Sequence, residues 1–204
     1  MPRRCERALD IGCGIGGFSR QLATIADSVE AIDRDPSVVD VARVASVGTK
    51  NLHFSCAEFM AYTSGMSSRY DFVCALSSLH HFGEAAAFQR IASLLRPGGV
   101  FGAIGLYRSH GISDLLWSLA AFPVSLMLRF MKRPVAHGVP LRDPSLTLSQ
   151  LRLLVGAYLP GATIRRRLLW RYTLLYHAPD YQNPVAAGDL PPNTSLQRAE
   201  LIRR

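Results

Sequence analysis

Three glycines and two acidic residues near the start of the chain have types and spacing that suit ligand binding. Gly12, Gly14 and Gly17 form the pattern Gly-x-Gly-x-x-Gly, and Asp33 follows about 20 residues later. Glycines at such a turn let the backbone approach a ligand closely, and the later carboxylate can accept hydrogen bonds from ribose hydroxyls. The pattern therefore predicts a nucleotide-like ligand, with Asp10 placed immediately before the loop.

The acid at position 10 helps to choose between two kinds of ligand. A dinucleotide such as NAD would place its pyrophosphate on the helix that follows the loop, and Asp10 would repel it. An oxidoreductase of that kind also takes catalytic groups from a second domain, for which 204 residues leave no room. A ligand that carries a cationic ammonium and a sulfonium suits Asp10 better.

Four blocks of the sequence, in this order, resemble the motifs of class I S-adenosylmethionine-dependent methyltransferases, with a methyltransferase type 11-like domain. The first resembles motif I, the second a strand that ends on the ribose-binding acid, the third the fourth strand, and the last the turn before strand five. These blocks are Ala8–Gly16, Val29–Asp33, Tyr70–Phe82 and Leu95–Gly99. The similarity is close over residues 7–106 and loose over 147–177, and it implies S-adenosylmethionine as the cofactor.

The resemblance implies a role for each matching position. Gly12, Gly14 and Gly16 would let the backbone approach the methionine and ribose parts of the cofactor. Asp10 would meet its amino group, and Asp33 would accept both ribose hydroxyls. The cofactor-binding residues that we expect are Asp10, Gly12, Cys13, Gly14, Gly16, Asp33, Arg34, Ala57, Glu58, Phe59 and Leu76. No metal site is expected, because the cysteines and histidines lack metal-ligand spacing.

One position departs from the family pattern. Related enzymes often place a carboxylate at the end of the third strand to receive the adenine amino group, and Cys56 stands there in this chain. Either the Glu58 side chain reaches the adenine, or backbone groups of Ala57 and Glu58 bind it while Phe59 adds an apolar contact. In both cases we expect a modest affinity for the cofactor.

Residues after the fourth strand lie where a methyl acceptor would bind. Ligands of open α/β sheets bind at the carboxyl ends of the strands, so the Leu76 backbone is expected to face the methionine end of the cofactor. His81 and His80 are the catalytic candidates, with His81 favoured as a pocket wall and simple packing as the alternative. Other candidates for proton removal are Tyr107, His110 and His137. A base is optional, because methyl transfer from a sulfonium depends mainly on alignment.

Hydrophobic patterning predicts the elements that position these residues. Short apolar runs predict strands over 7–11, 29–32, 51–56, 70–76 and 100–106. Helices are expected over Phe18, Leu22 and Ile25, from Pro36, over 85–95, and from Thr147, which forms a capping box with Gln150. The stretches 162–168 and 170–177 would finish the sheet as an antiparallel pair. We therefore expect a Rossmann-like, doubly wound α/β fold of three layers (αβα), mostly parallel with an antiparallel C-terminal strand.

One domain, residues 1–177, is expected to bind the cofactor. Within it, 107–144 is expected to be a helical lid or insertion over the edge of the sheet, and 178–204 to be a disordered tail. The apolar run 115–128 is shorter than the ~18–20 residues of a spanning helix. It is expected to be a buried or lid helix or, alternatively, part of a segment (112–131) that contacts a membrane or a lipid-like substrate. The first predicted strand begins close to Met1, so either the protein continues upstream or the insertion alone covers the site.

Charge and cysteine content limit the classes of binding partner and the cellular compartment that we expect. The formal net charge of +8 comes from arginines near both ends and at Arg165–Arg167, a spread that is typical of a solvated surface and makes nucleic-acid binding the less favoured alternative. The four cysteines form no Cys-x-x-Cys pair, and the N-terminal residues lack the apolar run of a signal peptide. A reduced, cytoplasmic setting is expected.

The function expected from the sequence is methyl transfer from S-adenosylmethionine to an oxygen, nitrogen or carbon atom of a small, apolar acceptor. The apolar residues of the insertion suggest that acceptor class. Two alternatives stand beside it. One is a nucleic-acid methyltransferase that contacts phosphates through Arg165–Arg171, and the other is a truncated, non-catalytic subunit that binds the cofactor.

Overall fold

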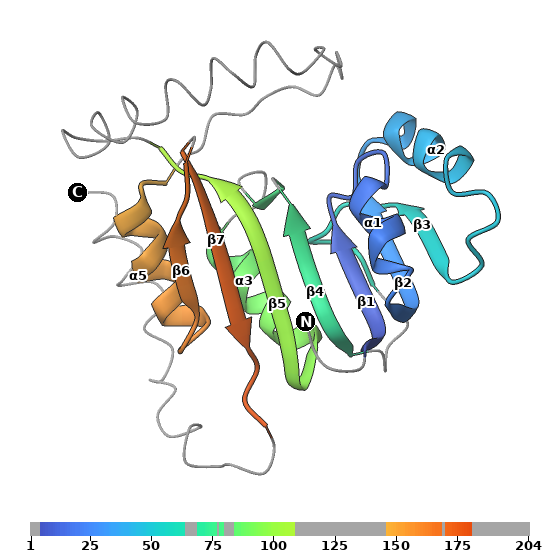
Figure 1. The fold of residues 1–204 in the computed structure, drawn as a ribbon. Helices are drawn as coiled ribbons and strands as arrows, with labels where there is room; N and C mark the ends of the chain where they lie inside the picture. The colour runs from blue at the N-terminus through green and yellow to red at the C-terminus, as the bar shows by residue number, and fades with distance from the viewer. Residues whose placement is uncertain are drawn as a thin grey trace.

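A computed structural model describes residues 5–63, 69–76, 78–79, 84–108, 146–168 and 170–180, which form a seven-stranded sheet with helices on both faces (Figure 1). The strands are β1 (Cys5–Ile11), β2 (Ala26–Asp33), β3 (Leu52–Cys56), β4 (Tyr70–Leu76), β5 (Leu95–Leu106), β6 (Thr163–Arg166) and β7 (Arg171–His177). The helices are α1 (Gly17–Leu22), α2 (Pro36–Val44), α3 (Glu84–Leu94) and α5 (Leu148–Tyr158). Within these ranges no helix is long and apolar enough to cross a membrane.

The strand order in the sheet is β3-β2-β1-β4-β5-β7-β6. Strands β1 to β5 are parallel to one another, and β7 lies antiparallel between β5 and β6. After β3 the chain crosses back to place β4 beside β1, so the strand order reverses between these two strands, where open α/β sheets bind their ligands. The expected mostly parallel α/β fold with an antiparallel C-terminal strand is confirmed.

Two apolar clusters hold the helices against the two faces of the sheet. On one face Leu22 of α1 packs with Val29 and Phe72. On the other face Phe88 of α3 and Leu151 of α5 pack with residues of β4, β5 and β7. The central strands are therefore covered on both sides, as their nearly continuous apolar sequences predict.

Local sequence signals explain where the helices start. Asp35 caps α2 by accepting a hydrogen bond from the Ser37 N–H, and Pro36 occupies the first turn. Thr147 and Gln150 form the predicted capping box of α5. The expectation for Ile25 was wrong: α1 ends at Leu22, and the Ile25 side chain lies in the following turn with 58% of its surface exposed.

The β5 strand starts earlier than its apolar run predicts. It begins at Leu95, which pairs with Tyr70, and its register then shifts before Val100 pairs with Phe72. The segment expected to be only a turn thus forms an irregular part of the strand, with Gly98 in a left-handed conformation (φ 72°). Hydrogen bonds from Gly98 N–H to Ala178 O and from Ala178 N–H to Gly99 O fix it against the end of β7.

The end of β5 is joined to two returning segments. The Tyr107 N–H donates to Trp170 O at 3.0 Å, which ties β5 to the turn between β6 and β7. The Arg108 N–H donates to Leu146 O at 2.7 Å. Most of the expected insertion (107–144) and tail (178–204) lies outside the described residues, so these expectations stay predictions.

At the amino ends of the central strands, Asp71 connects three strands. Its Oδ2 atom accepts hydrogen bonds from the N–H groups of Glu6 and Arg7 at 2.9 and 2.8 Å, and its Oδ1 atom accepts one from Arg96 at 3.0 Å. Arg96 also forms an ion pair with Glu6 at 3.1 Å. These bonds hold the starts of β1, β4 and β5 in register.

A second polar cluster is centred on Glu30 of β2. Its Oε2 atom accepts hydrogen bonds from the hydroxyls of Tyr62 and Tyr70 at 2.5 and 2.6 Å, and its Oε1 atom pairs with Arg7. Burial acts to raise the pKa of Glu30, but the hydrogen bonds from the two tyrosines and Arg7 outweigh it and lower that pKa overall. The carboxylate therefore stays ionised inside a ring of donors.

Candidate functional site

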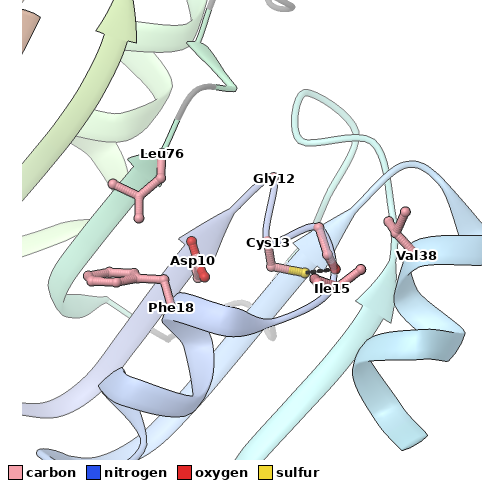
Figure 2. Close-up of a pocket in the computed structure, with 8 residues that line it drawn as sticks. Asp10, Gly12, Cys13, Ile15, Phe18, Val38 and Leu76 are labelled. Atoms are coloured by element: carbon pink, nitrogen blue, oxygen red, sulfur yellow. Dashed lines mark hydrogen bonds between the residues drawn. The ribbon is translucent and has the colours of Figure 1, made fainter. Parts of the chain in front are cut away.

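A cavity of about 310 Å³ opens where β1 ends in the glycine loop (Figure 2). Its volume is at the lower end of the range of about 300–1,000 Å³ for ligand pockets. It is lined by Asp10, Gly12, Cys13, Gly14, Ile15, Phe18, Val38 and Leu76. These residues come from β1, the loop, α1, α2 and the end of β4, so the cavity lies at the reversal of strand order.

Backbone hydrogen bonds to β2 fix the glycine loop. The N–H groups of Gly12 and Cys13 both donate to Ile32 O, at 2.8 and 3.0 Å, which fixes the loop to the end of β2. Gly12 has φ 72°, and a Cβ atom there would lie 2.3 Å from Ser78 Cβ. Gly16 has φ 74°, and its Cβ would meet the Phe54 ring at 2.7 Å. Both positions therefore require glycine for the fold itself.

The Asp10 side chain provides the charge of the cavity. It is only 1% exposed and accepts hydrogen bonds from the Ser19 hydroxyl at 2.6 Å and the Cys74 thiol at 3.4 Å. Burial raises the pKa of Asp10, while the bonds from Ser19 and Cys74 act in the opposite direction. A buried carboxyl of this kind gains stability from a cationic partner, because that partner restores the interaction lost with water.

The Asp33 carboxylate, at the end of β2, is fixed beside the same loop. Its Oδ2 atom accepts from Gly14 N–H at 2.9 Å, and its Oδ1 atom accepts from Asp35 N–H at 3.0 Å. Each oxygen retains acceptor capacity after one hydrogen bond, since a carboxylate has about four lone-pair sites. The Asp33 carboxylate can therefore accept further hydrogen bonds beside the loop.

The cavity brings together part of the predicted cofactor site. Of the eleven expected residues, it is lined by Asp10, Gly12, Cys13, Gly14 and Leu76. Cys13 contributes a neutral thiol, because burial, followed by the charges of Asp10 and Asp33, raises its pKa. Gly16 shapes the loop, and Asp33 reaches the site through its bond to Gly14.

The residues expected to recognise adenine are arranged differently from the prediction. Phe59 is 2% exposed and packs in the core with Arg90 over its ring, so its ring does not face the cavity. The Ala57 N–H already donates to Asp33 O at 2.8 Å. The exposed Cys56 thiol contacts Arg34 O at 3.6 Å. Phe59 does not line the cavity. How the adenine is bound, by the Glu58 side chain or by backbone groups of Ala57 and Glu58 with an apolar contact from Phe59, stays a prediction.

Three lining residues were missed by sequence reasoning. Ile15 is the variable residue between the loop glycines, Phe18 lies on the first turn of α1, and Val38 lies near the start of α2. Phe18 had been predicted as a helix residue without a role in the site. Its position two residues after the last left-handed glycine, Gly16, is the signal that could have placed it there.

Most of the catalytic candidates are not among the residues that the structure describes. His80, His81, His110 and His137 are beyond the described residues, so their roles stay predictions. Tyr107 is described, and it is not a free base: its side chain is 3% exposed and its hydroxyl accepts a hydrogen bond from Arg166 Nε at 2.7 Å.

The cavity offers features that fit S-adenosylmethionine. A buried carboxyl lines it, the protein has no atom within 4 Å of where a Cβ at Gly14 would lie, and a fixed carboxylate stands beside the loop. Asp10 would hold the cationic amino group, the loop backbone would lie along the methionine and ribose, and Asp33 would bind the ribose hydroxyls. Fold and cavity together define a Rossmann-like S-adenosylmethionine-binding domain.

Comparison with known proteins supports the same assignment. A family model described as a methyltransferase domain matches residues 8–99. An uncharacterized methyltransferase of Mycobacterium tuberculosis is 31% identical over 183 residues, covering 88% of this chain and 90% of that protein. A ubiquinone biosynthesis O-methyltransferase of Methylocella silvestris is 36% identical over 112 residues, 53% of this chain and 43% of that protein.

Solved structures show the same fold. The N-methyltransferase NodS from Bradyrhizobium japonicum, in complex with S-adenosyl-L-homocysteine, superposes with a TM-score of 0.59 at 12% identity, covering 87% of this chain and 80% of that one. The YcgJ protein from Bacillus subtilis gives a TM-score of 0.60 at 19% identity, covering 80% and 65%. The chain belongs to the class I S-adenosylmethionine-dependent methyltransferase family and is an enzyme that uses this cofactor.

Proposed function

We propose that this methyltransferase acts on a small, apolar acceptor and transfers the methyl group to an oxygen, nitrogen or carbon atom. The observation that carries the proposal is the composition of the cavity wall: Phe18 and Leu76 flank Asp10 at the reversal of strand order, where the acceptor would approach (Figure 2). An apolar wall favours an apolar acceptor, because a charged one would lose hydration there without a partner. The relatives named as O-methyltransferases favour oxygen among the three atoms.

The residues of the chain position the reactants. When bound, S-adenosylmethionine supplies a methyl group that is already activated on a sulfonium. Asp10 would fix the amino end, Asp33 would fix the ribose, and the wall formed by Phe18 and Leu76 would exclude water from the reacting end. Alignment of this kind can supply about 7–11 kcal/mol of the barrier reduction, so the chain needs few chemically active groups.

For a hydroxyl acceptor we propose His81, with His80 as the second candidate, as the group that removes the proton. Both follow Leu76 in the sequence, directly after the strand end that lines the cavity. A pH–rate profile would test this role: His81→Gln should lower kcat and remove the limb near the pKa of a histidine, about 6.5. An unchanged profile in both His81→Gln and His80→Gln would rule out these two histidines as the base.

The decisive experiment measures methyl transfer from isotopically labelled S-adenosylmethionine to a panel of acceptors. Quinols, phenols, an aliphatic amine, a fatty acid and tRNA sample the proposed and alternative classes. We expect label in the apolar phenols or quinols and none in tRNA. Label in tRNA alone would replace the proposal by the nucleic-acid alternative, and the Asp10→Asn variant provides the background for each acceptor.

We also propose that the protein works in the cytoplasm. Cys5, Cys13, Cys56 and Cys74 are all free thiols, which suits a reducing compartment. Fractionation of cells that express the full chain, with immunodetection in cytosolic, membrane and exported fractions, tests the compartment. Recovery in the exported fraction would contradict it.

A further inference from the structure

The turn between β6 and β7 exposes two large apolar side chains. Leu168 and Trp170 have 40% and 42% of their surface exposed, and both lie in the short connection from Arg167 to Arg171. Single exposed apolar residues are common on protein surfaces, but a leucine and a tryptophan in one tight turn form a protruding pair.

The backbone of this turn makes the tryptophan an unusual choice. Arg167 N–H donates to Arg171 O, so three residues close the hairpin, and the third of them, Trp170, has φ 54°. Three-residue hairpins commonly end on a residue in this left-handed conformation, which glycine adopts without strain. A bulky residue there is rare and costs about 1 kcal/mol or more. The chain thus has a tryptophan at a position where the backbone conformation favours glycine.

The surroundings of the turn are strongly basic. Between Leu146 and Pro179 the sequence has five arginines and no aspartate or glutamate. Arg165, Arg167 and Arg171 are exposed on the hairpin, and Arg108 is exposed at the adjacent end of β5. Arg167 Nε contacts the Thr173 hydroxyl at 3.2 Å. Exposed arginines of the hairpin and of the end of β5 thus accompany the exposed apolar pair.

The turn lies on the same edge of the sheet as the cofactor cavity. Arg171 at the start of β7 pairs with Leu106 at the carboxyl end of β5, and Ile104 of β5 pairs with Leu76, which lines the cavity. Figure 1 shows the tip of the β6–β7 hairpin beside the arrowhead of β5, with β4 as the next strand of the sheet. A surface that binds the hairpin would therefore face the edge at which the site opens.

We propose that the β6–β7 turn docks the enzyme on a membrane surface that contains anionic lipids. Trp170 and Leu168 would enter the boundary between headgroups and acyl chains, where tryptophan is favoured, and the arginines would contact lipid phosphates. Nucleic acid is the less favoured partner, because phosphates alone give no reason for exposed leucine and strained tryptophan at the tip. The inference goes beyond the proposed acceptor class, and vesicle binding is measured without turnover, so either can fail alone.

The test uses the full chain and vesicles of defined composition. In co-sedimentation, we expect binding to vesicles of phosphatidylglycerol and phosphatidylcholine, weak binding to phosphatidylcholine alone, and loss of binding at high salt. Tryptophan fluorescence should be quenched by brominated acyl chains, and the part of the quenching due to Trp170 should vanish in Trp170→Phe while Trp117 remains. Absence of binding to the anionic vesicles overturns the proposal.

Matched variants separate docking from folding. Trp170→Gly relieves the left-handed strain and should bind anionic vesicles about tenfold more weakly or worse. Leu168→Ser should also weaken binding, whereas Leu153→Ser, at a leucine of α5 that is 68% exposed, should not. Arg171→Gln should lower the affinity about fivefold, and Lys50→Gln, which removes the same charge beyond α2, should change it little.

Two measurements keep these outcomes interpretable. Each variant should keep the affinity of the native chain for S-adenosyl-L-homocysteine and melt no lower than the native chain, which shows that the fold and cofactor site are intact. Equal vesicle binding by Trp170→Gly and the native chain would overturn the proposal. Arginine-dependent binding to tRNA that Trp170→Gly leaves unchanged, without vesicle binding, would assign the basic surface to nucleic acid.

Discussion

Among single residues, we expect Asp10 to have the largest effect on the affinity for the cofactor. In Asp10→Asn the shape is retained and the negative charge is lost, so the cationic amino group of the cofactor loses its partner. Hydrogen bonds to charged groups contribute about 1.5–3 kcal/mol, and we expect the Kd for S-adenosyl-L-homocysteine to rise about 10- to 100-fold in calorimetry. The control is Asp40→Asn, which removes the same charge from an exposed position of α2 and should leave the affinity unchanged. An unchanged Kd in Asp10→Asn would contradict the assigned role.

The same residue predicts a pH dependence of stability. Burial raises the pKa of Asp10 above its ordinary value of 3.8, so the folded state binds this proton more tightly than the unfolded state. The free energy of unfolding of the cofactor-free native protein, relative to Asp10→Asn, should therefore fall as the pH rises from 3.8 to the folded-state pKa and be constant above it. Urea unfolding of both proteins across this range measures the difference. A rising difference would mean that the carboxylate is stabilised in the empty site.

Gly14 and Gly17 test whether the loop serves the ligand or the fold. Neither would bring a Cβ atom within 4 Å of the protein, but Gly14 has φ 52° and lines the cavity, whereas Gly17 begins α1. Gly14→Ala should lose about 1 kcal/mol of stability and most of its cofactor affinity, because the methyl group fills ligand space. Gly17→Ala should keep both. Thermal unfolding and calorimetry compare the two, and equal affinities would refute a ligand role for Gly14.

For single residues of the site, the sequence predicts the positions that follow from local spacing. It does not predict side-chain contacts between different helices and strands. The glycines, Asp10 and Asp33 follow from their positions relative to strand ends, and the cavity and its hydrogen bonds bring them together. The contacts of Asp10 with Ser19 and Cys74 join three elements, so no local pattern indicates them. Phe59 is predicted as a cofactor contact from its place just after the third strand, and the structure packs its ring in the core, which its position along the chain does not reveal.

Among the elements, the Glu30 cluster joins β1, β2, β4 and the segment after β3. Glu30→Gln should lower the free energy of unfolding by about 1–3 kcal/mol at neutral pH, because the donors around it lose an anionic acceptor. The pKa of Glu30 is lowered in the folded state, so its contribution is present above 4.5, the ordinary value, and is lost as the pH falls through the folded-state pKa. Denaturant unfolding of both proteins should converge at acidic pH, and a constant difference would exclude the carboxylate as its source.

The predicted elements differ in how closely they match the structure. The β4 strand and the starts of α2 and α5 match, because an apolar run, a proline and a capping box act over a few residues. The start of β5 does not match, because the irregular pairing of Leu95 with Tyr70 depends on the neighbouring strand and on Ala178. The length of α1 was also overestimated, since Ile25 continues the helical spacing after the helix has ended.

For the whole molecule, the amino and carboxyl ends of the strands have different roles. The amino edge is held together by Asp71, whereas the carboxyl edge forms the cavity. Asp71→Ala should therefore lower the free energy of unfolding by about 1–3 kcal/mol and change the Kd for S-adenosyl-L-homocysteine less than twofold when measured on folded protein. Denaturant unfolding and calorimetry give the two values. A large loss of affinity with the stability retained would show that the edges are coupled.

The hydrogen bond from Arg108 N–H to Leu146 O has a consequence for how such enzymes diversify. It brings the end of β5 together with the residue that precedes the cap of α5. Because doubling the length of a loop costs only about 0.6 kcal/mol, we expect that the sequence between these two residues can be exchanged without disturbing strand register. Grafting the corresponding segment of a relative between these two residues offers a route to chimeras that inherit cofactor use from one parent and acceptor choice from the other.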